Sequence, residues 1–164
     1  MNDWFATEGS PSPLGITWVP GEEAFNFALY SKHATAVTLL LYADGDVVHP
    51  CGRLVLDPIT NKSGRVWHCR IKAREMAATK YYAYLVAGPN TPGEGHRFDD
   101  QKILFDPYAR QLFFPPEFSR DTARTPGSNA GRAPLAVIPS ADAFDWTGDA
   151  RPIHTSDLII YELH

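Results

Sequence analysis

Hydrophobic positions in the first half of the chain recur with a period of two. Within residues 24–30, Phe25, Phe27 and Leu29 fall on one side and Asn26 on the other. This is the period of a β-strand that places one face on a core, so Asn26 is expected outside or on the other side of the sheet. No segment carries a long 3.6-residue period. The pattern therefore predicts a mostly β protein.

A second run, residues 36–42 (AVTLLLY), is apolar almost without interruption. Such a run is typical of a central strand that is covered on both faces. The turn-forming residues 44–46 (DGD) follow it and predict a hairpin into Val47 and Val48. Further strands are expected at residues 53–56, 66–71 and 81–86, each bounded by turn residues.

The spacing of these strands indicates the fold class. Short strands without intervening long helices favour an antiparallel sandwich over a doubly wound sheet. Only residues 72–79 (KAREMAAT) have the composition of one or two helical turns. We therefore predict an all-β protein, an antiparallel β-sandwich followed by a long irregular C-terminal extension.

The extension begins after Gly88, where Gly, Pro, Asn and Asp become frequent. Residues 115–134 form a loose stretch rich in Pro, Ser and Arg. A loop of this length lies over another domain or is disordered. The last residues, 157–164 (DLIIYELH), form an apolar run that predicts a buried strand without a partner in this chain.

Composition and charge narrow the function classes. A chain of 164 residues fits one ordinary domain plus a tail. Its net charge of −4 provides no basic field for a phosphate backbone, so we expect no nucleic-acid partner. No apolar run approaches the length of a membrane span, and residues 1–4 lack the pattern of a secretory signal. We expect no membrane partner and a cytoplasmic location. Cys51 and Cys69 are expected to be reduced, with a single disulfide between them as the alternative.

The sequence contains none of the common catalytic or cofactor motifs. There is no G-x-S-x-G elbow, H-E-x-x-H helix, C-x-x-C pair or phosphate-cradling glycine loop. The most metal-like set comprises His96, Asp99, Asp100 and Asp106. Because Asp commonly forms turns, we interpret these residues as local hydrogen-bonding groups. No catalytic residue, metal site or cofactor is expected.

Aromatic side chains are the remaining candidates for function, since Trp and Tyr rings stack on the apolar faces of sugars. Trp67 lies on the same strand face as Cys69 and Ile71, which predicts a core position, whereas His68 is expected at a surface or domain boundary. Tyr82 and Tyr84 share one face of their predicted strand, and Tyr81 lies on the other.

Six segments in order carry a family resemblance. They are residues 10–18 (SPSPLGITW), 25–31 (FNFALYS), 61–68 (NKSGRVWH), 95–98 with 104–110 (GHRF, LFDPYAR), 144–146 (FDW) and 157–164 (DLIIYELH). Together they resemble the amino-terminal part of isoamylases and glycogen-debranching enzymes of the α-amylase superfamily, glycoside hydrolase family 13. The resemblance implies a fold of the class called carbohydrate-binding module family 48, an early-set immunoglobulin-like sandwich.

The resemblance also implies a domain division and a function. A sandwich would occupy residues 1–110 and a linker residues 111–156, and residues 157–164 would begin the first strand of a missing catalytic (β/α)8 barrel. The family's catalytic carboxylates lie on later barrel strands, so the chain alone is expected to be inactive. The whole enzyme would hydrolyse α-1,6 branch linkages in glycogen or starch by a retaining two-carboxylate mechanism. This chain would be its non-catalytic scaffold and help to position substrate; the alternative is an autonomous α-glucan-binding or regulatory module.

Two partners follow from this reading: the catalytic barrel of the same enzyme, and an α-glucan such as glycogen, starch or a maltooligosaccharide, bound weakly. Glycogen-binding members of the class place a Trp after the strand that here ends near Tyr42, and Ala83 and Leu85 also depart from the family pattern. With Trp67 expected in the core, the candidate carbohydrate-binding rings are Tyr42, Tyr81 and Trp146. For Trp146 the alternative is a plug against a neighbouring domain.

Overall fold

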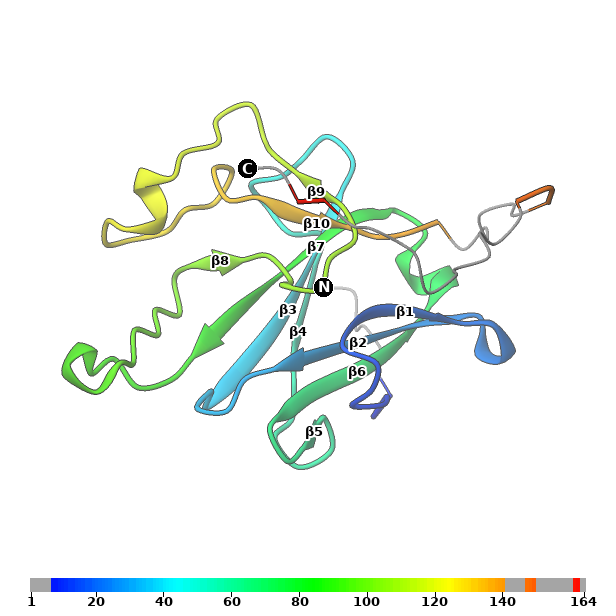
Figure 1. Cartoon of the computed structure of the whole chain (residues 1–164), viewed down its shortest axis with the longest axis horizontal. Coiled ribbons are helices and arrows are strands. Elements are labelled where there is room, and N and C mark those ends of the chain that lie inside the picture. The colour runs from blue at the N-terminus through cyan, green and yellow to red at the C-terminus, as the bar shows by residue number, and fades with distance from the viewer. Residues whose placement is uncertain (1–6, 141–146, 150–160, 163–164) are drawn as a thin grey trace.

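The structure, a computed structural model, describes residues 7–140, 147–149 and 161–162. It is all-β and consists of two antiparallel sheets packed face to face, which confirms the predicted sandwich (Figure 1). In the described part of the chain, helical structure is confined to four short 3₁₀ turns: η1 (Pro20–Glu22), η2 (Ala73–Met76), η3 (Pro92–Glu94) and η4 (Asp121–Ala123). The turn η2 falls in the segment expected to be helical. No helix among the described residues is long and apolar enough to cross a membrane.

The first sheet contains four strands in the order β1-β2-β6-β5. Its members are β1 (Gly15–Val19), β2 (Ala24–Tyr30), β6 (Val66–Lys72) and β5 (Lys62–Ser63). The register pairs Phe27 of β2 with Cys69 of β6, which aligns the apolar faces of the two strands. The predicted alternation of β2 is therefore confirmed on the face that meets the second sheet.

The second sheet runs in the order β4-β3-β7-β10-β9, and β8 pairs with a further part of β7. Its strands are β3 (Ala36–Ala43), β4 (Gly52–Val55), β7 (Thr79–Ala87), β8 (Ile103–Leu104), β9 (Leu112–Phe113) and β10 (Leu135–Val137). The predicted hairpin after β3 exists, but its returning strand begins at Gly52 and not at Val47, because residues 44–51 form a longer turn. Strands β9 and β10 come from the range expected as a linker. Strand β10 pairs with β7 and so protects part of its edge, and β9 pairs in turn with β10.

The core between the sheets is built from the inward faces of the long strands. Trp67, Phe27, Leu39, Tyr82 and Tyr84 are all fully buried within it. The rings of Phe27 and Tyr82 meet edge to face at 5.3 Å, across the two sheets. The core position predicted for Trp67 and the common face predicted for Tyr82 and Tyr84 are confirmed.

A second core lies on the other side of β3 and β7. It contains Leu40, Tyr42, Tyr81, Ile103 and Leu135. The segments that follow β7 cover this face, on the side of the second sheet away from the first (Figure 1). Strand β3 is thus buried on both faces, as its continuous apolar run predicted.

The outer face of the first sheet is covered by the N-terminal segment, which overturns one prediction. His68, expected at a surface, is buried: its Nδ1 lies 2.6 Å from the carbonyl oxygen of Glu8 and its Nε2 2.8 Å from Ser63 Oγ. Asn26 is buried beside it and exchanges two hydrogen bonds with the backbone of Ser10. Both side chains point away from the main core, as alternation requires, but residues 7–10 lie over them.

Both cysteines are free thiols, as expected. Cys69 is fully buried between the sheets, and this burial raises the pKa of its thiol to about 12. Cys51 lies at the surface, and its Sγ donates to the carbonyl oxygen of Leu41. Neither position favours an ionised, reactive thiolate.

Candidate functional site: a cleft and an apolar groove in the segments after β7

The structure corrects the expected ring platform. Tyr42 is 0% exposed and Tyr81 only 5%, so neither presents a ring face to solvent. Tyr81 instead stacks on Phe113 of β9, with ring centroids 4.6 Å apart. The segments 103–137 cover both rings, and sequence alternation could place the rings on one face without showing that this face is covered. Trp146, the third candidate, lies outside the described residues.

Asp106 connects the covering segment to the main core. Its carboxylate accepts a hydrogen bond from the Tyr82 hydroxyl at 2.9 Å and another from the backbone N–H of Tyr108 at 2.8 Å. The side chain is buried, and this burial raises the pKa of Asp106 above its ordinary value. Asp106 thereby fixes the turn of residues 106–109 against β7.

The metal-like set does not converge. Asp99 caps a local turn by accepting from the backbone N–H of Gln101 at 3.0 Å, and the His96 ring packs at a tilt against the His33 ring, with centroids 4.4 Å apart. The Asp106 side chain already accepts hydrogen bonds from the Tyr82 hydroxyl and the backbone N–H of Tyr108. Among the described residues, no group of three or more potential ligands could hold a metal ion.

The raised pKa of Asp106 predicts a pH dependence that Asp106→Asn removes. Because the folded state holds this proton more tightly than the unfolded state, the contribution of Asp106 is fully present below its unfolded pKa of about 4 and is lost as pH rises through the folded value. Urea unfolding between pH 4 and 7 should therefore show the wild type losing free energy of unfolding relative to the variant.

Asp46→Asn is the matched control with the opposite sign. The backbone N–H groups of His49 and Val48 donate to Asp46 and lower its pKa, so its contribution is present at neutral pH and lost on acidification. Parallel pH profiles for Asp106→Asn and the wild type would contradict the burial of an ionisable Asp106.

Lys102 and Asn129 fix the loop that follows β9. The ammonium group of Lys102 donates to the carbonyl oxygens of Thr122 at 2.8 Å, Thr125 at 2.5 Å and Gly127. The Asn129 side chain accepts from the backbone N–H of Ile103 at 2.8 Å and donates to its carbonyl oxygen at 3.1 Å. Residues 115–134, which the sequence marked as loose, are thus anchored at several buried polar groups.

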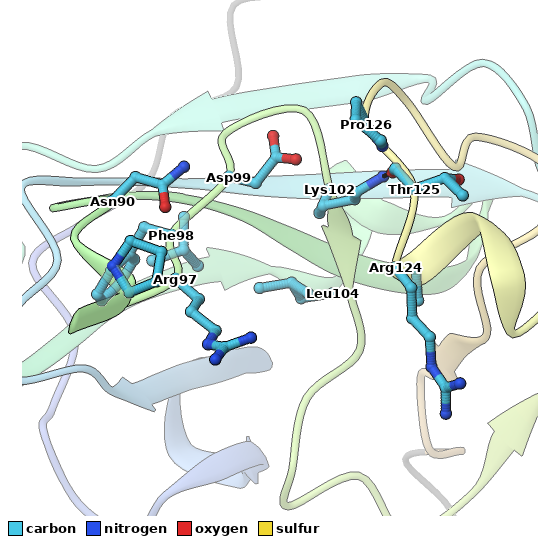
Figure 2. A pocket seen from close by; sticks show the side chains of 12 residues that line it. Asn90, Arg97, Phe98, Asp99, Lys102, Leu104, Arg124, Thr125 and Pro126 are labelled. Carbon is cyan, nitrogen blue, oxygen red and sulfur yellow. Dashed lines mark hydrogen bonds between the residues drawn. The ribbon is translucent and has the colours of Figure 1, made fainter. Parts of the chain in front are cut away.

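An open cleft of about 960 Å³ lies between this anchored loop and the segment that follows β7 (Figure 2). Arg97 and Arg124 lie on opposite sides of Leu104, and Asn90 and Asp99 also line the cleft (Figure 2). Neither guanidinium has a hydrogen-bond or ion-pair partner among the residues that the structure describes. The cleft therefore offers two unpaired guanidiniums beside the apolar side chain of Leu104.

A second, mostly apolar depression of about 410 Å³ adjoins the cleft, with Ala123 and Arg124 lining both. We call it the apolar groove; its main apolar residues are Phe105, Leu112, Phe114, Phe118 and Pro134. Phe105 is 42% exposed and Phe114 54% exposed, and the rings of Phe114 and Phe118 meet edge to face at 5.0 Å. A contiguous exposed patch of large apolar side chains marks a surface for association.

Of these groove and cleft residues, only Asp99 was a candidate from the sequence, as a member of the metal-like set. One signal was present: Phe114 directly follows Phe113, the last residue of the short strand β9, so alternation turns the two rings to opposite sides. Arg97 and Arg124 lie in loops with no periodic pattern, and their sequence separation hides their meeting in one cleft.

The family model and the sequence relatives that match this chain point to the same family. Residues 13–109 match the family model described as carbohydrate-binding module 48 (isoamylase N-terminal domain). The chain is 35% identical over 161 residues to isoamylase SU1, chloroplastic, of Zea mays, with 95% of this chain and 20% of the relative covered. It is 34% identical over 169 residues to the glycogen debranching enzyme of Yersinia enterocolitica, covering 96% of this chain and 23% of the relative.

Solved structures show the same fold at low identity. The catalytic module of the glycogen-degrading pneumococcal virulence factor SpuA superposes with a TM-score of 0.54 at 18% identity, over 82% of this chain and 17% of that one. The GBS pullulanase SAP in complex with maltotetraose gives a TM-score of 0.53 at 16% identity, over 80% and 15% of the two chains. The chain spans about a fifth of the length of the relatives that it matches in sequence.

Proposed function

This chain belongs to the carbohydrate-binding module 48 family of isoamylase N-terminal domains, and we propose that it is the non-catalytic scaffold module of a glycogen- or starch-debranching hydrolase. In this proposal the whole enzyme hydrolyses α-1,6 branch linkages, and the module docks on its catalytic domain. The relatives named isoamylase and glycogen debranching enzyme support that choice of reaction. The chain alone is expected to release no reducing ends from glycogen.

The apolar groove is the observation that carries this proposal. Phe105 and Phe114 are large and exposed, and Phe118 extends the same surface. Since each relative is roughly five times longer than the matched part, a partner surface within the same polypeptide is available to cover the groove. An autonomous glucan-binding module would gain nothing from exposing this patch to water, which favours the scaffold role over that alternative.

A complementation experiment tests the docking role. The Yersinia enterocolitica glycogen debranching enzyme, shortened by the part that matches this chain, is mixed with the purified chain. We expect the two to associate in sedimentation velocity and the mixture to release reducing ends from glycogen faster than the shortened enzyme alone. Phe105→Glu combined with Phe114→Glu should weaken the association roughly tenfold or more, because two charges would have to be desolvated.

Ile59→Glu is the matched control, because Ile59 is also apolar and highly exposed but lies in the loop between β4 and β5, outside the groove. It should associate as the wild type does. Equal losses in both variants, or no association of the wild-type chain, would contradict docking through the groove. Retention of the chain on glycogen without any association would favour the autonomous module.

A further inference from the structure

A pocket of about 320 Å³ lies on the outer face of the second sheet and shares no lining residue with the cleft or the apolar groove. We call it the β3 pocket, because Leu40 and Tyr42 of β3 line it. Arg53 of β4 pairs across the sheet with Leu40, so its side chain rises from the same face. The other apolar lining residues are Val48, Pro50, Leu85, Ile103 and Ala130. The pocket thus combines an aliphatic floor with two oppositely charged side chains, Arg53 and Asp100.

The Tyr42 hydroxyl is an unsatisfied group of a residue that lines this pocket. The side chain is fully buried, and its hydroxyl has no hydrogen-bond partner in the part of the chain that the structure describes. Buried hydroxyls are nearly always paired, because leaving one unpaired costs its desolvation. Burial raises the pKa of Tyr42 to about 12 against the opposing effect of the Arg53 charge, so the hydroxyl stays a neutral donor near neutral pH. An unpaired donor within the field of a guanidinium points to a ligand with a negatively charged group.

The charges that line the β3 pocket favour a zwitterion over a simple anion. Arg53 lies on β4 and Asp100 in the segment that leads to β8, with β3 and β7 between them. A phosphate group would be attracted by Arg53 but repelled by Asp100. A molecule with both a carboxylate and an ammonium group can pair with each of the two side chains.

The apolar part of the pocket favours an aliphatic group over a sugar ring. Among the described residues that line it, none presents an aromatic ring face, since Tyr42 is fully buried. A pyranose ring would therefore lack the stacking surface that Trp and Tyr rings provide. A branched aliphatic side chain can instead pack on Leu40 and Leu85, and the pocket volume lies at the lower end of the range for small-molecule sites.

Contacts within the chain hold the walls of the pocket in place. The Asp46 carboxylate accepts a hydrogen bond from the backbone N–H of Val48 at 3.0 Å, which fixes the turn after β3. Val48 packs against Gly131, where an added Cβ would lie 2.8 Å from the Val48 side chain. On the opposite wall the Asn129 side chain bonds both backbone groups of Ile103. A prearranged site reduces the ordering cost of binding, so a few polar contacts suffice for measurable affinity.

We propose that the β3 pocket binds a free α-amino acid with an aliphatic side chain. Arg53 and the Tyr42 hydroxyl hold its carboxylate, Asp100 holds its ammonium group, and the aliphatic floor takes its side chain. Such a site gives the module a small-molecule ligand that is neither its substrate nor its docking partner. It does not depend on the scaffold role, because it shares no lining residue with the apolar groove.

The test is a titration of the ¹⁵N-labelled chain with L-leucine, followed through backbone amide signals. We expect saturable shifts confined to residues 47–53, 100–103 and 128–130, with a dissociation constant in the millimolar range. Isocaproate, which is leucine without its ammonium group, should bind at least fivefold more weakly to the wild type. Asp100→Asn should lose this preference, because the variant no longer offers a negative charge to the ammonium group.

Two variants test the carboxylate end of the site. Arg53→Ala, at an exposed position of an edge strand, should bind leucine at least tenfold more weakly, as expected for the loss of a charged donor. Tyr42→Phe should bind about fivefold more weakly and yet leave the midpoint of urea unfolding unchanged or raised, because it removes only an unsatisfied hydroxyl. Arg74→Ala is the matched control, since it changes an exposed arginine of η2 outside the pocket, and it should bind as the wild type does.

Four results would overturn the assignment. Leucine shifts located elsewhere, or none at all, would exclude the β3 pocket. The same shifts with inorganic phosphate would make it a simple anion site, and the same shifts with maltose would make it a polyol site. Leucine binding that both Arg53→Ala and Tyr42→Phe leave unchanged would remove the carboxylate contacts.

Discussion

Trp67→Ala is expected to lower the free energy of unfolding by about 3–5 kcal/mol, because truncating a fully buried aromatic side chain loses its transfer free energy and leaves a cavity. Trp67 is the second residue of β6, where it pairs with Leu29 of β2 and Lys62 of β5. The neighbouring strands are held in register by backbone hydrogen bonds and can relax only partly into the space. Chemical denaturation followed by far-UV circular dichroism measures the loss.

Val55→Ala is the control for this comparison. Val55 is also apolar and also lies in a strand, β4, but its side chain is 70% exposed. Its truncation should change the free energy of unfolding by no more than about 0.5 kcal/mol. If Trp67→Ala cost as little as Val55→Ala, the position of Trp67 between the two sheets would be wrong.

Lys102→Ala is expected to cost roughly 3 kcal/mol, since it removes several charged hydrogen bonds from one buried ammonium group at once. The loss should be local as well as global, because the three acceptor carbonyls lie in one loop, residues 122–127. Hydrogen exchange should therefore accelerate most in residues 119–133, and urea denaturation measures the overall loss.

Lys80→Ala separates this effect from the simple loss of a lysine. Lys80 forms an ion pair with Asp44 at 2.9 Å, and both side chains are well exposed. Exposed pairs of this kind contribute at most about 1 kcal/mol. Unchanged exchange in residues 119–133 of Lys102→Ala would show that this loop is held by other contacts.

The long strands and their inner faces could be predicted because their signals are local. Alternation in β2 identifies the side that meets the core, and the unbroken apolar run of β3 requires cover on both faces. Trp67 follows from the same rule, as does the division of Tyr82 and Tyr84 from Tyr81. Each of these inferences needs only side-chain order along one strand.

The cover over the outer faces could not be predicted in the same way. Tyr42 and Tyr81 were assigned to an open surface, but the segments around β8, β9 and β10 bury them. These strands are only two or three residues long, so they carry no readable period. The surface position expected for His68 was wrong for a related reason, since residues 7–10 reach this side chain from far along the chain.

The sequence by itself determined the all-β class, the inward faces of the long strands and, through its ordered motifs, the family. Those properties can be read from residue order, because the period of a strand and the spacing of a motif can be recognised without three-dimensional information. Only the tertiary structure decided which surfaces remain open. The cleft brings Asn90 and Arg97 together with Arg124. The apolar groove brings Phe105 together with Phe114 and Phe118. The loops that carry these residues are held in place by the buried side chains of Lys102, Asp106 and Asn129. Such convergence depends on long-range hydrogen bonds and packing, which no local pattern encodes.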